Sequence, residues 1–86
     1  MDQYEIVVSK SAEKELCKLP IHVNNRIIVS ILRLEEDPRP VDSTKLRGGS
    51  KNWRIRIGDY RVVYAIDDEL KVVDIRKVGH RKDIYE

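Results

Sequence analysis

The sequence predicts a single α+β domain in which two helices cover one face of a largely antiparallel sheet. Three observations indicate this class: helical spacing of apolar residues over 12–34, hairpin-like alternation over 53–66, and short β-branched stretches at 4–8 and 70–78. The chain has 86 residues, enough for one modest core, so we expect one domain covering residues 1–86.

The chain is predicted to begin with a strand over Tyr4–Val8, followed by a short helix. Ser9 or Ser11 can cap that helix, because a serine hydroxyl accepts a bond from a free N–H of the first turn. From Ala12, apolar residues recur at i+4 and i+7, which makes one stripe of about two turns. Pro20 interrupts the pattern.

A second helix is predicted from Pro20 to about Glu36, antiparallel to the first. Proline fits the first turn of a helix, where its missing N–H is not needed. The predicted inner face consists of Val23, Ile27, Ile31 and Leu34, with Ile28 and Leu32 widening it. The segment Asp37–Pro40 ends the helix, because a residue that precedes a proline avoids the helical region.

The stretch Trp53–Ile57 alternates apolar and polar side chains, as a half-buried strand does. Gly58 and Asp59 then supply a two-residue turn, for which glycine at the first position is suited, and Tyr60–Ile66 continues as a second strand. The aromatic side of this hairpin, with Trp53, Tyr60 and Tyr64, is interpreted as core.

The other side of the hairpin is predicted to carry three arginines. A two-residue loop places Arg56 opposite Arg61, and Arg54 shares their face. Two like charges opposed across a ladder are unfavourable by about 0.2 to 1 kcal/mol. An anionic ligand would relieve this repulsion, although a solvated surface is the simpler interpretation of such a triplet.

A third strand is predicted over Leu70–Val78 after a polar turn at Asp67–Glu69. Its apolar residues break strict alternation, which favours a central strand with both faces partly covered. The N-terminal strand, the helical pair and this three-stranded antiparallel meander together complete the sheet.

Charge is distributed unevenly along the chain. Residues 1–43 carry a net charge of −2, residues 44–65 carry +5 and residues 66–86 carry −1. A local positive field of this kind indicates a polyanionic partner. No apolar run is long enough for a membrane span, and the opening residues do not resemble a secretory signal, so the expected location is cytoplasmic.

The loop over Val41–Lys51 contains two glycines and three cations. It lacks the Gly-Lys-Ser/Thr of a phosphate-binding P-loop. It is either a flexible connection or a guide for a nucleic-acid backbone, and the residues predicted to contact RNA or the ribosome are Lys45, Arg47, Lys51 and, near the C-terminus, Lys82. The single cysteine, Cys17, and His22 have no companions at metal-ligand spacing, so neither a metal nor a cofactor is expected.

Four motifs in this chain resemble the RelE branch of the RelE/ParE toxin superfamily. They are Lys45-Leu46-x-Gly48, Trp53-Arg54-Ile55-Arg56, Gly58–Tyr64 and Val78–Tyr85. The resemblance implies a RelE-like fold and the toxin of a type II toxin–antitoxin system, held in a hetero-oligomer by a cognate antitoxin. It also implies an enzyme that cleaves messenger RNA in the ribosomal A site, by attack of a ribose 2′-hydroxyl without a metal.

The resemblance matches Arg54, Arg56, Arg61, Arg81 and Tyr85 to functional positions of the family. A site for this chemistry needs a base, a proton donor and positive charge for the crowded phosphate. The hairpin arginines can supply the charge, and Tyr85 can act as base if nearby cations lower its pKa. The donor is either Arg81 or His80.

Other interpretations remain open for these residues. His80 can be a simple turn residue, and Tyr85 can be a frayed end. The alternative function is a ParE-like protein that inhibits DNA gyrase without catalysis, on the same scaffold. A third class is a module that binds ribosomes or RNA without cutting.

Overall fold

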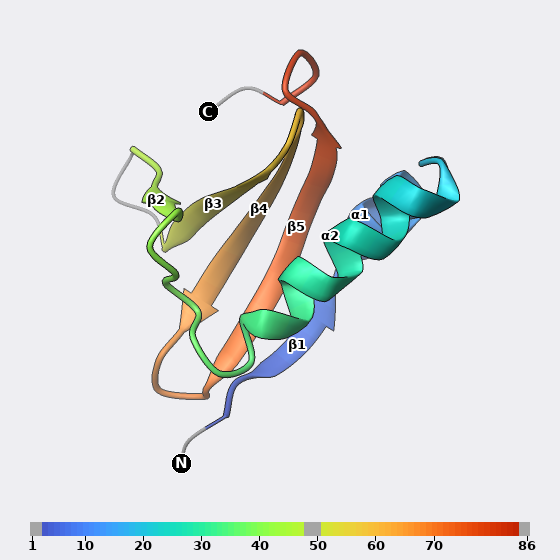
Figure 1. Ribbon diagram of the computed structural model, residues 1–86. Coiled ribbons are helices and arrows are strands. Elements are labelled where there is room, and N and C mark those ends of the chain that lie inside the picture. Colours follow the sequence, from blue (N-terminus) through green and yellow to red (C-terminus); the bar gives the residue numbers. More distant parts are fainter. Residues whose placement is uncertain (1–2, 48–50, 85–86) are drawn as a thin grey trace.

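The protein is described by a computed structural model over residues 3–47 and 51–84, and it has the predicted α+β architecture. The elements are β1 (Glu5–Val8), α1 (Lys10–Cys17), α2 (Ile21–Arg33), β2 (Thr44–Lys45), β3 (Asn52–Ile57), β4 (Tyr60–Asp67) and β5 (Val72–His80). They build one five-stranded sheet, and both helices lie to one side of it (Figure 1). Neither of these helices is long and apolar enough to span a bilayer.

The strands lie in the order β1-β5-β4-β3-β2. β1 is parallel to β5 and all other neighbours are antiparallel, which confirms the predicted, largely antiparallel sheet. β2 is an addition, because the sequence predicts a loop there. Its two residues, Thr44 and Lys45, pair with Arg54 and Trp53, and so short a strand leaves no periodic pattern in the sequence.

The two helices begin close to where the sequence predicts them. Ser9 caps α1 by accepting a bond from the Ala12 N–H at 3.1 Å. α2 ends at Arg33 rather than near Glu36, and the next three residues continue with i→i+3 bonds that tighten the last turn. The helices are linked where Asn24 of α2 donates to the Leu16 carbonyl of α1 at 2.8 Å.

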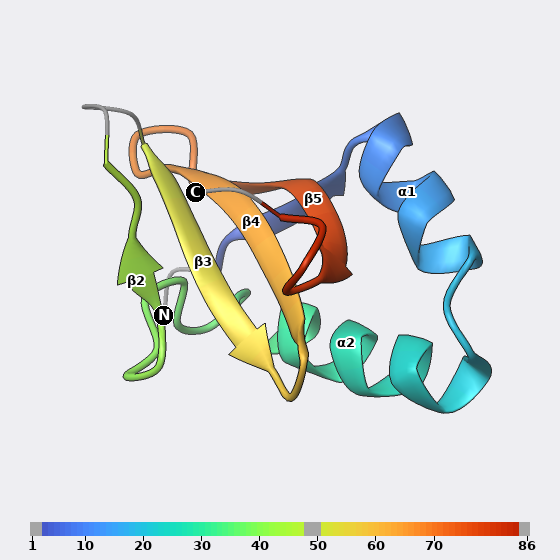
Figure 2. The ribbon, with the colours of Figure 1, turned by 90° about the horizontal axis from the view of Figure 1, so that it is seen from above.

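Figure 2 shows the helices on one side of the sheet, and one hydrophobic core lies between the helices and the sheet. Val23, Ile27 and Ile31 of α2 and Leu34 after it are buried as predicted, and both helices contribute to the same cluster as β3, β4 and β5. Leu32, which was predicted to widen this face, is instead 51% exposed, because it lies one position beyond the buried stripe. The fully buried members with the largest side chains are Tyr64, Ile27, Leu34, Ile75, Val62, Val73 and Val78. Because both helices are on this side, no helix of the described residues covers the opposite face of the sheet.

An irregularity in β5 explains its broken alternation. Val63 pairs with Lys77, but the next residue, Tyr64, pairs with Ile75, so Arg76 is an extra residue at this point. Because of this bulge, Val78 lies on the core side of the sheet and Lys77 lies on the face opposite the helices. The predicted central position of this strand is confirmed, since β5 lies between β1 and β4.

Three distant segments are joined at the end of the sheet where β4 turns into β5. Asp68 in this turn accepts bonds from both terminal nitrogens of Arg39, at 2.7 and 3.2 Å, and from the Tyr4 hydroxyl at 2.7 Å. The bonds from Arg39 and then Tyr4 lower the pKa of Asp68 to about 2, and the same carboxylate raises the pKa of Arg39. Asp68 therefore fixes both the N-terminal segment and the loop after α2.

Replacing Asp68 by asparagine is expected to lower stability at neutral pH and to flatten the acid side of the stability curve. Because the folded pKa lies below the value of the unfolded chain, Asp68 stabilises the fold above about pH 4, and this contribution is lost as pH falls towards 2. Urea unfolding between pH 2 and 7 measures the difference. The neighbouring Glu69→Gln variant is the control, and equal acid sensitivity of the Asp68→Asn variant and the parent would contradict the assignment.

Candidate active site

The β3–β4 hairpin has the predicted two-residue turn and register. Gly58 has a φ of +59°, which glycine adopts without the steric cost that a side chain would bring. Arg56 then pairs with Arg61, and Arg54 pairs with Val63. Since paired residues lie on the same face and alternate along each strand, all three arginines share the face opposite the helices. We call this surface the arginine face.

The three arginines differ in how they are held. Arg54 is only 8% exposed, Arg61 is half-buried and Arg56 is exposed. The Nη1 of Arg61 donates to the carbonyls of Gly58 and Tyr60, at 3.0 and 2.9 Å, which draws its guanidinium towards the turn. These two carbonyl acceptors orient the guanidinium of Arg61 at the turn end of the arginine face.

Lys77 joins the arginine face, and sequence reasoning missed it. It lies opposite Val63 in the row that also contains Arg54, and its side chain is exposed. Simple alternation along β5 could not place Lys77 on this face, because the extra residue Arg76 changes the register. The sequence feature that could have identified Lys77 is a cation on the strand predicted to lie next to the hairpin.

The segment after β5 returns to the arginine face. A side chain at Gly79, which pairs with Arg61, would lie 3.4 Å from Cγ1 of Ile84. Ile84 is 8% exposed and, like Val63, is buried apart from the main core. It therefore packs on the same face as the arginines. Tyr85, the predicted base, lies outside the described residues.

Arg81 lies beside the hairpin turn, close to the end of the arginine face. Its backbone N–H donates to the Asp59 carbonyl at 2.8 Å, and its Nε is 3.9 Å from the Asp59 carboxylate. Both side chains are more than half exposed, so this long ion pair is weak and leaves the guanidinium accessible. Lys82 follows in the same exposed turn.

His80 is placed on the other side of the sheet. It pairs with Tyr60, and the two rings meet edge to face with centroids 5.5 Å apart. Tyr60 packs against the core, so the imidazole lies on the helix side, away from the arginine face. Its Nδ1 accepts the Lys82 N–H at 3.2 Å, as in a turn. The structure thus brings the arginines together and leaves His80 apart from them.

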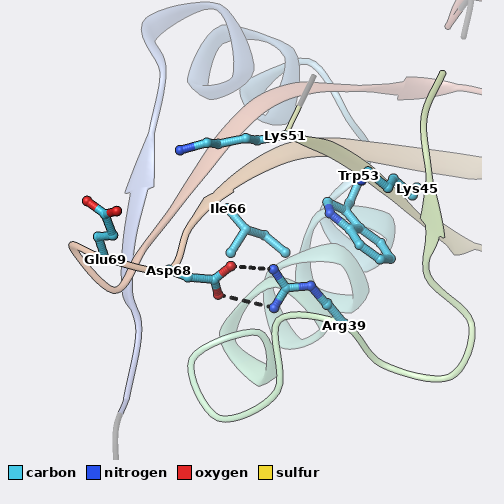
Figure 3. Close-up of a pocket in the computed structure, with 7 residues that line it drawn as sticks. All are labelled: Arg39, Lys45, Lys51, Trp53, Ile66, Asp68 and Glu69. Atoms are coloured by element: carbon cyan, nitrogen blue, oxygen red, sulfur yellow. Dashed lines mark hydrogen bonds and ion pairs between the residues drawn. The ribbon is translucent and has the colours of Figure 1, made fainter. Parts of the chain in front are cut away.

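Two of the predicted RNA-contacting lysines line a separate hollow on the helix side. This hollow has a volume of about 450 Å³ and is bordered by Lys45, Lys51, Trp53 and the Arg39–Asp68 pair (Figure 3). The guanidinium of Arg39 lies over the Trp53 ring at 5.4 Å from its centroid. Trp53 and Tyr60 are partly buried against the core and Tyr64 is fully buried, as predicted for the aromatic side of the hairpin.

Arg47 lies in the exposed part of the loop and joins neither the arginine face nor this hollow. Across residues 3–47 and 51–84, no three histidine, cysteine, aspartate or glutamate side chains come together as a metal site would require. The charged groups that the pairing places on the arginine face are guanidinium and ammonium groups.

The fold and its cationic face define a small toxin of a known superfamily. The model of the ParE toxin family of type II toxin–antitoxin systems matches residues 6–85, so the chain belongs to this family within the RelE/ParE superfamily.

Named relatives agree with this assignment. Toxin RelG of Mycobacterium tuberculosis is 33% identical, over 95% of each chain. The mRNA interferase toxin RelE of Escherichia coli is 32% identical, over 92% of this chain and 84% of the relative. The crystal structure of the archaeal RelE–RelB complex from Pyrococcus horikoshii superposes with a TM-score of 0.83, at 32% identity over 95% of this chain and 99% of that one.

Proposed function

We propose that this toxin is an endoribonuclease that enters the ribosomal A site and cuts the messenger RNA there. The observation that carries the proposal is the convergence of Arg56, Arg61 and Lys77, with the nearly buried Arg54, on the sheet face opposite the helices. A cluster of cations suits a phosphodiester, and the planar forks of arginine can grip two phosphate oxygens at once. Relatives named mRNA interferase support the same activity.

In this proposal, the arginine face stabilises the charge that builds up as a ribose 2′-hydroxyl attacks the adjacent phosphate. The attack forms a bond from the 2′-oxygen to phosphorus and breaks the bond to the 5′-oxygen, without a metal. Tyr85 is the base that takes the 2′-hydroxyl proton. Arg81 is preferred over His80 for the leaving 5′-oxygen, because the imidazole of His80 lies on the opposite side of the sheet.

A cognate antitoxin is the proposed restraint on this activity. Solved relatives include toxin–antitoxin complexes from Pyrococcus horikoshii and Mycobacterium tuberculosis. An acidic segment of the antitoxin would neutralise the arginine face and exclude messenger RNA from it. A complex of the two proteins in which Arg56 and Arg61 keep their full accessibility would contradict this part of the proposal.

Mapping message ends tests the proposed activity directly. Adding the toxin to a translating extract is expected to produce new 5′-ends within codons that occupy the A site. The same message incubated without ribosomes is the control and should remain largely intact. Translation that stops while the message keeps its original ends would overturn the proposal.

A second candidate function also needs a test, because the matching family model is that of the ParE toxin. A ParE-like inhibitor would act on DNA gyrase through protein contacts, with no need for a phosphate-binding face. A supercoiling assay with purified gyrase separates the two candidates. Loss of supercoiling with an intact message would support the gyrase inhibitor instead.

A further inference from the structure

The hollow on the helix side combines a guanidinium held beside an aromatic ring with two exposed lysines (Figure 3). Both terminal nitrogens of Arg39 donate to Asp68, so the charge of this guanidinium is already paired with a carboxylate. Trp53 lies beside the guanidinium, with its ring centroid 5.4 Å from Cζ, and does not cover all of it. The Arg39 side chain remains 39% exposed, which leaves a flat surface, held in place by Asp68 and Trp53, on which another ring can stack.

Lys45 and Lys51 border the same hollow, and both are exposed. The charge of Asp68 is balanced by Arg39, so the two lysines outnumber the remaining carboxylate of Glu69. The volume of about 450 Å³ lies within the range of small-ligand sites. A stacking plane with ammonium groups beside it is the combination that holds a nucleotide of a single strand.

We propose that this hollow binds one nucleotide of a single-stranded RNA, with the base stacked on Arg39 and the backbone phosphate held by Lys45 and Lys51. Trp53 and Ile66 place the hollow on the helix side, whereas the arginine face lies on the opposite side. The nucleotide bound here is therefore in a flanking part of the strand, distinct from the phosphate to be cut. The inference rests on the proposed function, because RNA is the substrate that function implies.

Recognition of this kind does not depend on sequence. Every base has a flat face that can stack on a guanidinium, and the lysines contact only phosphate. The hollow would thus add affinity for single strands without restricting which codon is cut. Double-stranded RNA, whose bases already stack on each other, would not use it.

The test uses the fluorescence of Trp53, the single tryptophan of the chain. The probe is a short single-stranded oligoribonucleotide with 2′-O-methyl groups, which cannot be cleaved by 2′-hydroxyl attack. Titration is expected to change the emission saturably. The Lys45→Ala, Lys51→Ala double variant should bind roughly tenfold more weakly and lower the slope of log affinity against log salt by about 1 to 2.

Arg39→Lys separates stacking from charge, because lysine can still pair with Asp68 but has no plane. Its affinity for the probe is expected to fall roughly tenfold. The matched control is Lys14→Ala with Lys18→Ala, which removes an exposed lysine of α1 and the exposed lysine directly after it and so changes the net charge equally at a distance from the hollow. This control should keep the affinity of the parent.

Three results would overturn the inference. The first is no saturable change in emission, and the second is equal weakening of binding by the control pair. The third is a signal that Arg56→Ala abolishes but that the Lys45, Lys51 and Arg39 variants leave unchanged. Cleavage is measured separately, in the translating extract. Binding at the hollow without any cleavage would preserve this inference and overturn the proposed function, so the two can fail independently.

Discussion

Replacing Arg61 by alanine is expected to reduce message cleavage roughly 100-fold or more, the scale for removing one group that stabilises a transition state. The guanidinium of Arg61 is oriented by the carbonyls of Gly58 and Tyr60, and it lies directly opposite Arg56. Its removal takes away an oriented positive charge from the arginine face. The measurement is the rate at which new message ends appear in a translating extract.

Arg61 is half-buried, so a companion variant is needed to separate activity from stability. Arg56→Ala changes an exposed side chain of the same face and should lose activity with little change in the midpoint of urea unfolding. Arg33→Ala, an exposed arginine on α2, is the matched control and should cleave normally. Parent-like cleavage by both the Arg61 and Arg56 variants would remove the arginine face from the mechanism.

Replacing Tyr64 by phenylalanine is expected to lower the free energy of unfolding by about 1 to 3 kcal/mol, because a buried acceptor loses its donor. The Tyr64 hydroxyl donates to the Pro38 carbonyl at 2.7 Å, and the side chain is fully buried. This bond fixes the loop after α2 against the middle of the sheet. Urea unfolding at neutral pH measures the loss.

The same substitution is expected to change the response to alkaline pH. Burial raises the pKa of Tyr64 from 10 to about 12, since the phenolate would be poorly solvated. The folded state therefore keeps its proton longer than the unfolded chain does. The stability that this provides is fully present below pH 10 and is lost as pH rises towards 12. If the phenylalanine variant lost as much stability as the parent over this interval, the assignment to Tyr64 would be wrong.

Most of the fold could be predicted because its elements have strong local patterns. The inner face of α2 and the alternation of β3 identify elements that bury one side. β2 could not be predicted, since two residues are too few to show an alternation of apolar and polar side chains. The end of α2 was also placed too late, because Leu34, the last apolar residue of the stripe, remains buried after the α-helix has ended.

Only the part of the candidate site that the β3–β4 hairpin forms could be predicted from the sequence. A two-residue turn fixes the pairing of Arg56 with Arg61, so their shared face follows from the sequence. The sides on which Lys77 and His80 lie depend instead on the extra residue Arg76, which sets the pairing of β4 with β5. The contact of Arg39 with Asp68 joins loops 29 residues apart, beyond the reach of any local pattern.

The parallel pairing of β1 with β5 has a consequence for biosynthesis. Glu5 lies beside Val72, so the first strand has no partner until almost the whole domain has been translated. Contacts of such large sequence separation form late and slow folding. Lys77 and the returning Ile84 likewise reach the hairpin only after β5 has docked. The arginine face is therefore complete only after nearly the whole domain has been synthesised, so the order of synthesis delays the assembly of the candidate site.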